Sequence, residues 1–245
     1  MKKLLCFYGW MLVLAGCSQK EIMDFESVDR IYWDYPVYNI NGTDVEVDSV
    51  TASFGMVPSG QWQDTAFFVV KCMGRVADVP RKYAISIVDS LSTMVEGIDF
   101  ERLDREQVFR AGVYTDTLRI VFYREHVNPS HIAKESKRLV LRIEKSADFD
   151  IGNAGKRVMK LSVNNYLAEP AWWSVDKNSP YLKYYHPEKW KVLMYYDQRI
   201  SNALELGVNT LELSNLCEKK ATPYLEYNKI YDSETHQRVF WDRLE

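Results

Sequence analysis

The densest group of side chains that could bind a ligand is a set of aromatic rings between residues 172 and 190. The rings belong to Trp172, Trp173, Tyr181, Tyr184, Tyr185 and Trp190. Rings exposed as a platform would stack on the C–H faces of sugars, which predicts a glycan-binding surface. Rings that instead seal a joint between two packed units would bury about 150 to 250 Å² each. The sealing role is the simpler interpretation, and an exposed aromatic patch would overturn it.

The acidic residues offer candidates for hydrolytic chemistry. A glycosidase needs two carboxylates, one as acid and one as nucleophile or base. The candidates form two groups: Asp99, Glu101 and Asp104, and then Asp148 and Asp150. No recognisable motif marks either group, and solvated turns explain such acids more simply. We therefore predict no catalytic carboxylate pair.

The sequence contains no local motif for a zinc site or for a catalytic nucleophile. The four histidines, which show no His-x-His or His-Glu-x-x-His spacing, are His126, His131, His186 and His236. No serine stands in a Gly-x-Ser-x-Gly turn and no Cys-x-x-Cys pair occurs. The sequence therefore predicts no catalytic residue, no metal and no cofactor.

The first half of the chain alternates apolar and polar residues, which indicates the elements that must position these side chains. A period of two is typical of strands with one buried face. The runs are Val50-Ala52-Phe54-Met56, Phe68-Val70-Cys72, Tyr83-Ile85-Ile87, Leu118-Ile120-Phe122, Leu139-Leu141-Ile143 and Met159-Leu161-Val163. With no convincing helix among them, they predict an antiparallel, Ig-like β-sandwich over residues 31–165.

From residue 166 the strand-like alternation gives way to a region rich in aromatic residues. Residues 166–245 are predicted to form a small, aromatic-rich helical or mixed subdomain. Pro187 followed by Glu188 is typical of a first helical turn. Apolar residues at helical spacing extend this helix to about residue 204. A second short helix is predicted around residues 236–244.

The N-terminus carries a secretion and lipidation signal. Lys2 and Lys3 precede an apolar stretch of about 11 residues, too short to span a bilayer as a helix. The stretch ends in Leu14-Ala15-Gly16-Cys17, which resembles a bacterial lipobox whose cysteine receives a diacylglycerol. We therefore expect residues 1–17 to be a lipoprotein signal peptide with Cys17 lipidated, and residues 18–30 to be a tether. Acyl chains at Cys17 would anchor the protein to a membrane without spanning it.

The residues after the lipobox indicate which membrane the lipoprotein is anchored to. Ser18 is not the aspartate that marks inner-membrane retention, so we expect the outer membrane. Ser18-Gln19-Lys20-Glu21 is a loose match to the surface-export signals of Bacteroidetes lipoproteins. Surface-exposed and periplasm-facing orientations both stay open.

Composition narrows the class of protein. Of the 245 residues, 47% are hydrophobic and 27% are charged, which is typical of a globular protein. The net charge of −3 supplies no basic excess for phosphate binding, so a nucleic-acid partner is disfavoured. Because Cys6 lies in the leader and Cys17 would be lipidated, only Cys72 and Cys217 could pair. We favour two free, buried thiols over a disulfide.

Several motifs occur in an order that resembles a known family. The sandwich motifs, which resemble the hairpin of Calx-beta-like domains, are Val95-Glu96-Gly97-Ile98-Asp99-Phe100, Val108-Phe109-Arg110-Ala111-Gly112 and the strand from Thr117 to Tyr123. The later motifs are Ser146-Ala147-Asp148-Phe149, Pro170-x-Trp172-Trp173, Tyr181-Leu182 and Lys189. Together they resemble the Bacteroidetes lipoprotein family catalogued as domain of unknown function 4843, from about Ile31 to Asp197.

This resemblance implies a Calx-beta-like sandwich in an uncharacterised envelope lipoprotein, often encoded beside outer-membrane glycan-import machinery of the SusC/SusD type. It brings no catalytic residues. Glycine is commoner in the family where this chain has Lys183, so the 181–187 loop is expected to differ. Some Calx-beta domains bind calcium through turn acids. Asp99, Asp148 and Asp150 are the candidates for such an oxygen cage, although the dense acidic run of a calcium loop is absent.

Three classes of function follow. The first is a non-catalytic envelope lipoprotein that binds polysaccharide, or supports its capture beside outer-membrane transporter proteins, and contacts the membrane through its lipid anchor. The second is a structural, assembly or adhesin-type surface lipoprotein. The third and weakest is a glycan hydrolase, which would need two carboxylates converging in a cleft.

Overall fold

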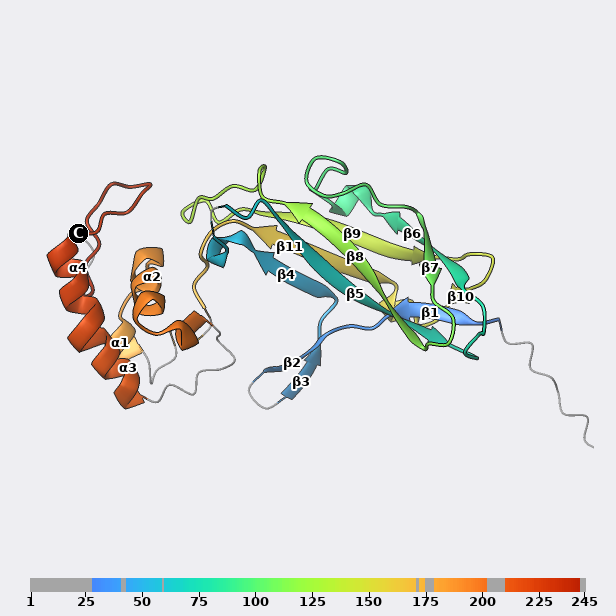
Figure 1. The fold of residues 1–245 in the computed structure, drawn as a ribbon, viewed down its shortest axis with the longest axis horizontal. Coiled ribbons are helices and arrows are strands. Elements are labelled where there is room, and N and C mark those ends of the chain that lie inside the picture. The colour runs from blue at the N-terminus through green and yellow to red at the C-terminus, as the bar shows by residue number, and fades with distance from the viewer. Residues whose placement is uncertain are drawn as a thin grey trace, which may run out of the picture.

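The structure is a computed structural model that describes residues 28–40, 43–58, 60–170, 172–174, 179–201 and 210–242. The expected signal peptide, Cys17 and most of the expected tether lie outside the described residues. A β-sandwich and a smaller helical unit follow one another along the long axis of the molecule (Figure 1). The predicted β-sandwich followed by a small helical part is confirmed.

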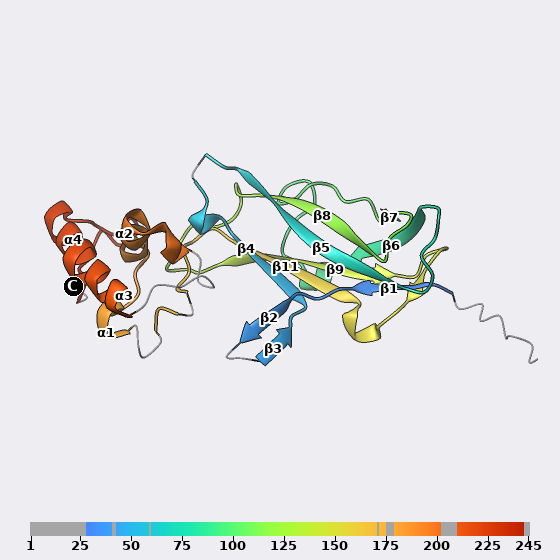
Figure 2. The ribbon, with the colours of Figure 1, turned by 60° about the horizontal axis from the view of Figure 1, so that its bottom comes forward.

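Two sheets form the sandwich. The first has four strands in the order β10 (Asp150–Ile151), β1 (Arg30–Trp33), β5 (Gln63–Met73) and β8 (Thr115–Tyr123). The second has five strands in the order β4 (Ser49–Ser53), β11 (Val158–Asn164), β9 (Ser136–Glu144), β6 (Arg81–Ile87) and β7 (Glu106–Phe109). A separate hairpin of β2 (Val37–Ile40) and β3 (Thr43–Glu46) projects from the sandwich in both views (Figures 1 and 2).

Alternation along the strands builds the first core. In β5, Ala66, Phe68, Val70 and Cys72 are buried, and Phe67 between them is 60% exposed. The alternating runs predicted from the sequence fall on β4, β5, β6, β8, β9 and β11, and most of their apolar side chains are buried. The hydrophobic pattern therefore identified the strands that form the core.

The sheets are not antiparallel throughout, which corrects the prediction. β1 pairs with β10 in parallel, and β4 pairs in the same way with β11. The chain between the partners is long in both cases, as a parallel pairing requires. The sandwich also begins inside the expected tether, because Arg30 is the first residue of β1 and Asp29 forms an ion pair with Arg81.

The C-terminal unit is helical. Its helices are α1 (Ser179–Leu182), α2 (Pro187–Tyr196), α3 (Thr210–Leu216) and α4 (Thr222–Asn228), with a π-helical segment, Cys217–Ala221, between α3 and α4. Helix α2 starts at the predicted proline but ends at Tyr196, where Asp197 leaves the helical conformation. The predicted helix near the C-terminus is wrong within residues 236–242, which contain no helix. No helix in the described segments combines the length and hydropathy needed to cross a bilayer.

A second core holds this unit together, and a lysine lies inside it. The side chain of Lys189 is fully buried, and its Nζ donates to the carbonyl oxygens of Leu182, Tyr184 and Trp241 at 2.7, 2.5 and 2.9 Å. The ammonium also faces the rings of Trp173, Tyr184 and Trp241. The resulting arrangement joins α2 to the loop before it and to the end of the described chain.

Candidate functional site: a histidine cluster and a polar cavity at the junction of the two units

The aromatic residues singled out by the sequence belong to the second core. Trp172, Trp173 and Trp190 are 8%, 0% and 5% exposed, and their rings pack edge to face or tilted against one another. This burial corrects the expectation of an exposed stacking platform, because a sugar cannot reach the face of a ring already covered by its neighbours. The packing fits the sealing role that the sequence also allowed.

The three tyrosines of the same group are only partly exposed. The hydroxyl of Tyr184 donates to the carbonyl oxygen of Phe240 at 2.6 Å, and that of Tyr185 donates to Leu167 at 2.5 Å. Tyr181 packs against the second core and its carbonyl oxygen accepts from the indole of Trp241. These contacts use the tyrosines to fix loops and the C-terminal segment.

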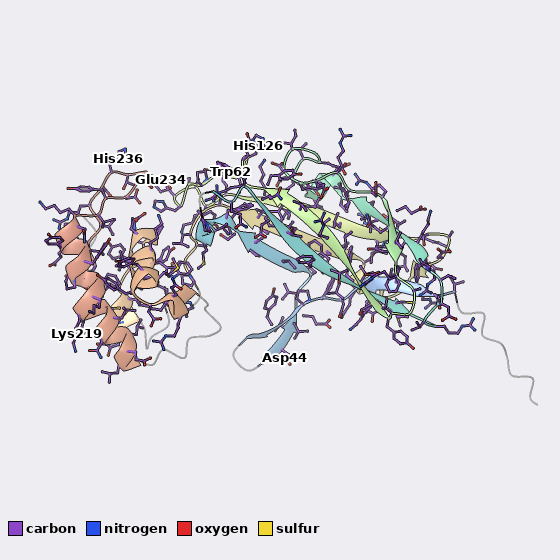
Figure 3. The ribbon with its side chains drawn as sticks, viewed as in Figure 1. Asp44, Trp62, His126, Lys219, Glu234 and His236 are labelled. Carbon is purple, nitrogen blue, oxygen red and sulfur yellow. The ribbon has the colours of Figure 1, made fainter. Side chains whose placement is uncertain are left out.

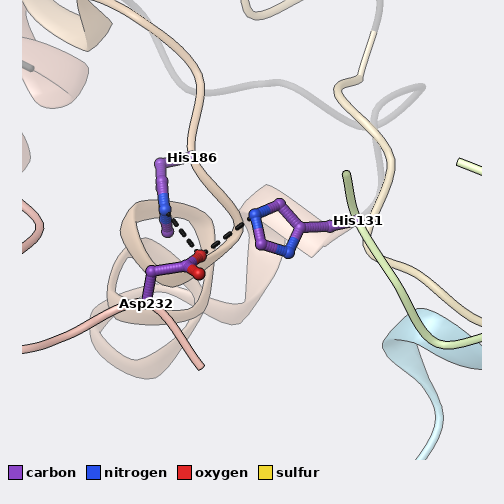
Figure 4. A group of neighbouring side chains, drawn as sticks. All are labelled: His131, His186 and Asp232. Atoms are coloured by element: carbon purple, nitrogen blue, oxygen red, sulfur yellow. Dashed lines mark ion pairs between the residues drawn. The ribbon is translucent and has the colours of Figure 1, made fainter. Parts of the chain in front are cut away.

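A different group of side chains meets at the junction. The carboxylate atom Oδ2 of Asp232 lies 3.0 Å from Nε2 of His131 and 3.0 Å from Nε2 of His186 (Figure 4). His131 comes from the loop between β8 and β9, His186 precedes α2, and Asp232 follows α4. We call these three residues the junction cluster. Its members come from three distant parts of the chain and carry no local motif, so sequence reasoning missed it.

Local structure fixes each member of the junction cluster. Oδ1 of Asp232 accepts the backbone N–H groups of Glu234 and Thr235 at 2.8 and 2.6 Å, which leaves Oδ2 for the imidazoles. His186 is the N-cap of α2, and its Nδ1 accepts the backbone N–H of Glu188. The Nδ1 atom of His131 lies 2.5 Å from Oε1 of Glu234, whose other oxygen accepts from Ser130.

These contacts set the charge of the cluster. Burial lowers the pKa of His186, which favours the neutral ring in the tautomer that donates from Nε2 to Asp232. Burial opposes the charge of Asp232, but the backbone N–H groups of Thr235 and Glu234, the Thr235 hydroxyl and His131 together outweigh burial and lower its pKa. The hydroxyl of Ser130 lowers the pKa of Glu234. Both carboxylates therefore favour the charged form, whereas a general acid needs a raised pKa.

A polar cavity of about 230 Å³ opens beside the junction cluster. Its lining combines the sandwich, the connecting segment and the helical unit, and includes Arg124, His131, Asn165, Glu188, Lys191 and Glu234. Arg124 donates from Nε to the side-chain oxygen of Asn165, and Lys191 pairs with Glu188 at 2.6 Å. Donors and acceptors of both charges thus face one small space.

An exposed tryptophan is hydrogen-bonded through its backbone to a residue of this lining. Trp62 is 64% exposed, and its carbonyl oxygen accepts the backbone N–H of Arg124 at 2.9 Å. Figure 3 shows Trp62 at the end of the sandwich that faces the helical unit. Sequence reasoning missed Trp62, although its position between Gln61 and Gln63 is a signal of exposure.

The acids considered for hydrolysis or calcium have other partners. Asp99 is fully buried and pairs with Lys137 at 2.6 Å. Asp148 accepts the backbone N–H of Lys82, and Asp150 pairs with Lys145 at 3.3 Å. Among the described residues, the group of ligand-type side chains close enough to share a metal ion is the junction cluster, which contains none of these acids.

Cys72 and Cys217 are free and buried, as predicted. They lie in different cores, Cys72 in the sandwich and Cys217 in the helical unit. Burial raises the pKa of the Cys217 thiol to about 12, which makes it an inert part of the core.

Residues 25–196 match the family described as Domain of unknown function (DUF4843). The chain belongs to that family. The match confirms the resemblance seen in the sequence motifs, and it covers the sandwich and helix α2 of this DUF4843 protein. No curated protein matches the chain in sequence.

Three similar solved structures share low identity with this DUF4843 protein. The apo form of the Calx CBD1 domain is 14% identical, with a TM-score of 0.36 over 56% of this chain and 97% of that chain. A Bacteroides ovatus protein of unknown function is 13% identical, with a TM-score of 0.37 over 54% of this chain and 43% of that chain. A two-domain Bacteroides fragilis protein of unknown function is 15% identical, with a TM-score of 0.33 over 56% of this chain and 46% of that chain. The chain thus spans less than half the length of the two Bacteroides chains.

Proposed function

We propose that this protein is a non-catalytic, lipid-anchored lipoprotein of the outer membrane that captures glycan at the junction of its two units. The lipobox ending at Cys17 supports the anchor, and Ser18 supports the outer membrane. The anchor holds the folded part on a membrane surface, either outside the cell or facing the periplasm. Metabolic labelling with palmitate tests this part: the wild-type chain takes up label, and Cys17→Ser does not.

The polar cavity carries the proposal of glycan capture. Sugar hydroxyls both donate and accept hydrogen bonds, so a site for them needs cationic donors and carboxylate or amide acceptors close together. Arg124, Asn165 and Glu188 supply these groups around the same space. The volume of about 230 Å³ lies below the roughly 300 to 1,000 Å³ of pockets for drug-sized ligands, so it suits one sugar unit of a longer chain.

Trp62 supplies the exposed ring that the buried tryptophans cannot. A flat indole with much of its surface in solvent can stack on the C–H face of a neighbouring sugar unit. Its carbonyl contact with the backbone of Arg124 fixes Trp62, just before β5, relative to the cavity. The proposed subsite pair is therefore the polar cavity together with Trp62.

Calorimetric titration of the full chain in detergent against starch, xylan, pectin and mucin glycans tests the proposal. We expect saturable binding to at least one of these probes. Trp62→Ala and Glu188→Gln should each weaken it by about tenfold or more, because each removes a stacking or hydrogen-bonding contact. Tyr227→Ala is the matched control, since Tyr227 is 87% exposed on α4. Heat that is absent for every probe, or equal in all variants, would contradict the proposal.

A role beside outer-membrane transporter proteins extends the proposal. A small anchored binder increases the local concentration of a glycan near an import channel without any catalytic step. Loss of the gene product should then slow growth on the bound glycan at low concentration more than at high concentration. Equal growth at both concentrations would contradict a capture role.

An apolar groove favours a structural or assembly role as the second candidate. A cavity of about 340 Å³ is lined by the segment that enters the β2–β3 hairpin, by β5 and by Val50 and Met159 of the second sheet, and its lining includes Val37, Phe67 and Val69. All three side chains are exposed, and exposed apolar surface of this kind is a common contact for proteins. Chemical cross-linking in whole cells through Phe67→Cys, with Leu211→Cys on α3 as control, distinguishes the assembly role from glycan capture. Specific cross-links from position 67 alone would support the assembly role.

A further inference from the structure

We propose that the junction cluster of His131, His186 and Asp232 is a zinc site that fastens the helical unit to the sandwich. The proposal does not depend on glycan capture. It starts from the chemistry of the donors, since two imidazoles and one carboxylate form a ligand set that zinc prefers.

The spacing of the donor atoms fits one small ion. The ligand atoms of the three residues all lie within 4.8 Å of one another, and Oδ2 of Asp232 is 3.0 Å from each Nε2. Tetrahedral zinc with bonds of 2.0 to 2.1 Å separates neighbouring ligand atoms by about 3.3 Å. Each Nε2 therefore needs to move away from Oδ2 of Asp232 by only a few tenths of an ångström, and the two imidazole donors already lie within 4.8 Å of one another. The dashed lines of Figure 4 mark the two ion pairs whose place the bonds to the ion would take.

Neighbouring groups already orient two of the three donors as zinc ligands. The Nδ1 side of His131 faces the carboxylate of Glu234, so the lone pair of Nε2 can point to the ion. A carboxylate behind a ligating histidine is a common partner in zinc sites. The backbone N–H groups of Glu234 and Thr235 occupy Oδ1 of Asp232 and leave Oδ2 as the ligand atom.

His186 must change its tautomer to bind. Its Nδ1 now accepts the backbone N–H of Glu188, so its proton is on Nε2. Coordination through Nε2 moves that proton to Nδ1 and breaks the capping hydrogen bond of α2. The lost cap is small beside the binding free energy of a zinc ion, so it lowers the affinity without preventing binding.

The polar cavity gives the ion a fourth position. His131 and Asp232 both line that cavity, so a water molecule can complete the tetrahedron from its side. Three protein ligands from the β8–β9 loop, the start of α2 and the segment after α4 would be joined by one ion. Zinc would therefore stabilise the contact between the units.

Titration of chelator-treated, untagged full chain in detergent with Zn²⁺ or Co²⁺ tests the site. We expect one equivalent to bind, with the visible absorption of tetrahedral cobalt, and the unfolding temperature to rise with zinc concentration. His131→Gln and His186→Asn should weaken binding by about 100-fold or more, because each removes one of three ligands. Asparagine at position 186 retains a capping side chain, which keeps helix α2 intact.

His126→Ala is the control variant. His126 is exposed and lies in the same β8–β9 loop, outside the junction cluster (Figure 3). This variant should bind zinc and cobalt as the wild type does. Absence of binding to the wild-type chain would overturn the proposal, and so would binding that both cluster variants retain.

Discussion

The Nζ atom of Lys189 lies 2.9 Å from the carbonyl oxygen of Trp241, which ties the C-terminal segment to helix α2. The same atom bonds to two carbonyl oxygens of the loop before α2, so one side chain satisfies three buried acceptors. The helical unit, which contributes His186 and Asp232 to the junction cluster, therefore depends on a polar contact inside its core as well as on apolar packing.

Lys189→Met should destabilise the helical unit strongly. Methionine fills similar space but leaves three carbonyl oxygens without a donor, and an unsatisfied buried acceptor costs about 1 to 3 kcal/mol. We expect a loss of about 3 kcal/mol or more in the free energy of unfolding, measured by urea denaturation. Lys191→Met, at an exposed lysine on the same helix, should change this free energy by less than about 0.5 kcal/mol. Equal effects of the two variants would contradict the role given to Lys189.

The same lysine predicts a pH dependence. Burial lowers the pKa of Lys189 to about 7 and outweighs the negative charge of Asp242, which acts to raise the pKa. The unfolded lysine has a pKa of about 10.4. Between pH 7 and 10 the unfolded chain thus holds a proton that the folded chain has released, so the free energy of unfolding rises with pH. The neutral amine of the folded chain then donates to two of the three carbonyl oxygens, whereas the ammonium donates to all three.

Comparison with Lys189→Met isolates this contribution. The difference in unfolding free energy between wild type and variant should grow by up to about 1.4 kcal/mol per pH unit between pH 7.5 and 9. Urea denaturation at several pH values gives both slopes. Parallel slopes would show that the three carbonyl oxygens keep the amine charged despite its burial.

Lys183→Gly should stabilise the protein. Lys183 has a φ of +57°, in the left-handed region that glycine adopts without strain, and its carbonyl oxygen accepts from the indole of Trp173. Relief of this strain should raise the free energy of unfolding by about 0.5 to 1 kcal/mol. Lys191→Gly, inside α2, should have the opposite sign, because glycine in a helix interior costs about 1 kcal/mol. Thermal unfolding of both variants shows whether each change raises or lowers the stability. A loss of stability in Lys183→Gly would contradict the proposed strain at Lys183.

Gly55→Ala should disturb the junction. A Cβ at position 55 would lie 2.3 Å from the carbonyl oxygen of Tyr166, which begins the connection to the helical unit. Because that neighbour is backbone, we expect a cost of about 2 kcal/mol or more. At Gly60 a Cβ meets nothing within 4 Å, so Gly60→Ala is the control and should be nearly neutral. Indistinguishable unfolding curves for the two variants would contradict the close approach.

The sequence predicted the parts of this protein that depend on local pattern. Leu118, Ile120 and Phe122 alternate because one face of β8 is buried, and Pro187 marks the start of α2 because its missing N–H costs nothing there. The short strands β1, β7 and β10 have too few residues to show a period. The sequence predicted a helical or mixed subdomain but no individual helix over α3 and α4, and these helices are held by packing around Cys217 and Leu225 in the second core.

The candidate site could not be predicted in the same way. His131, His186 and Asp232 meet only because the β8–β9 loop, the start of α2 and the segment after α4 converge at the junction. Single-sequence spacing contains no information on such long-range contacts. The aromatic residues were conspicuous in the sequence because large rings gather in cores as well as on binding surfaces, and Trp172, Trp173 and Trp190 belong to a core.

Hydrogen–deuterium exchange of the full chain, with and without starch, xylan, pectin or mucin glycans, tests glycan capture at the junction most directly. We predict that at least one probe slows exchange in the segments 124–131, 165–167 and 186–191, each of which contributes residues to the polar cavity, and leaves the β2–β3 hairpin unchanged. Exchange that no probe slows, or protection confined to the hairpin and the outer face of β5, would contradict capture at the junction.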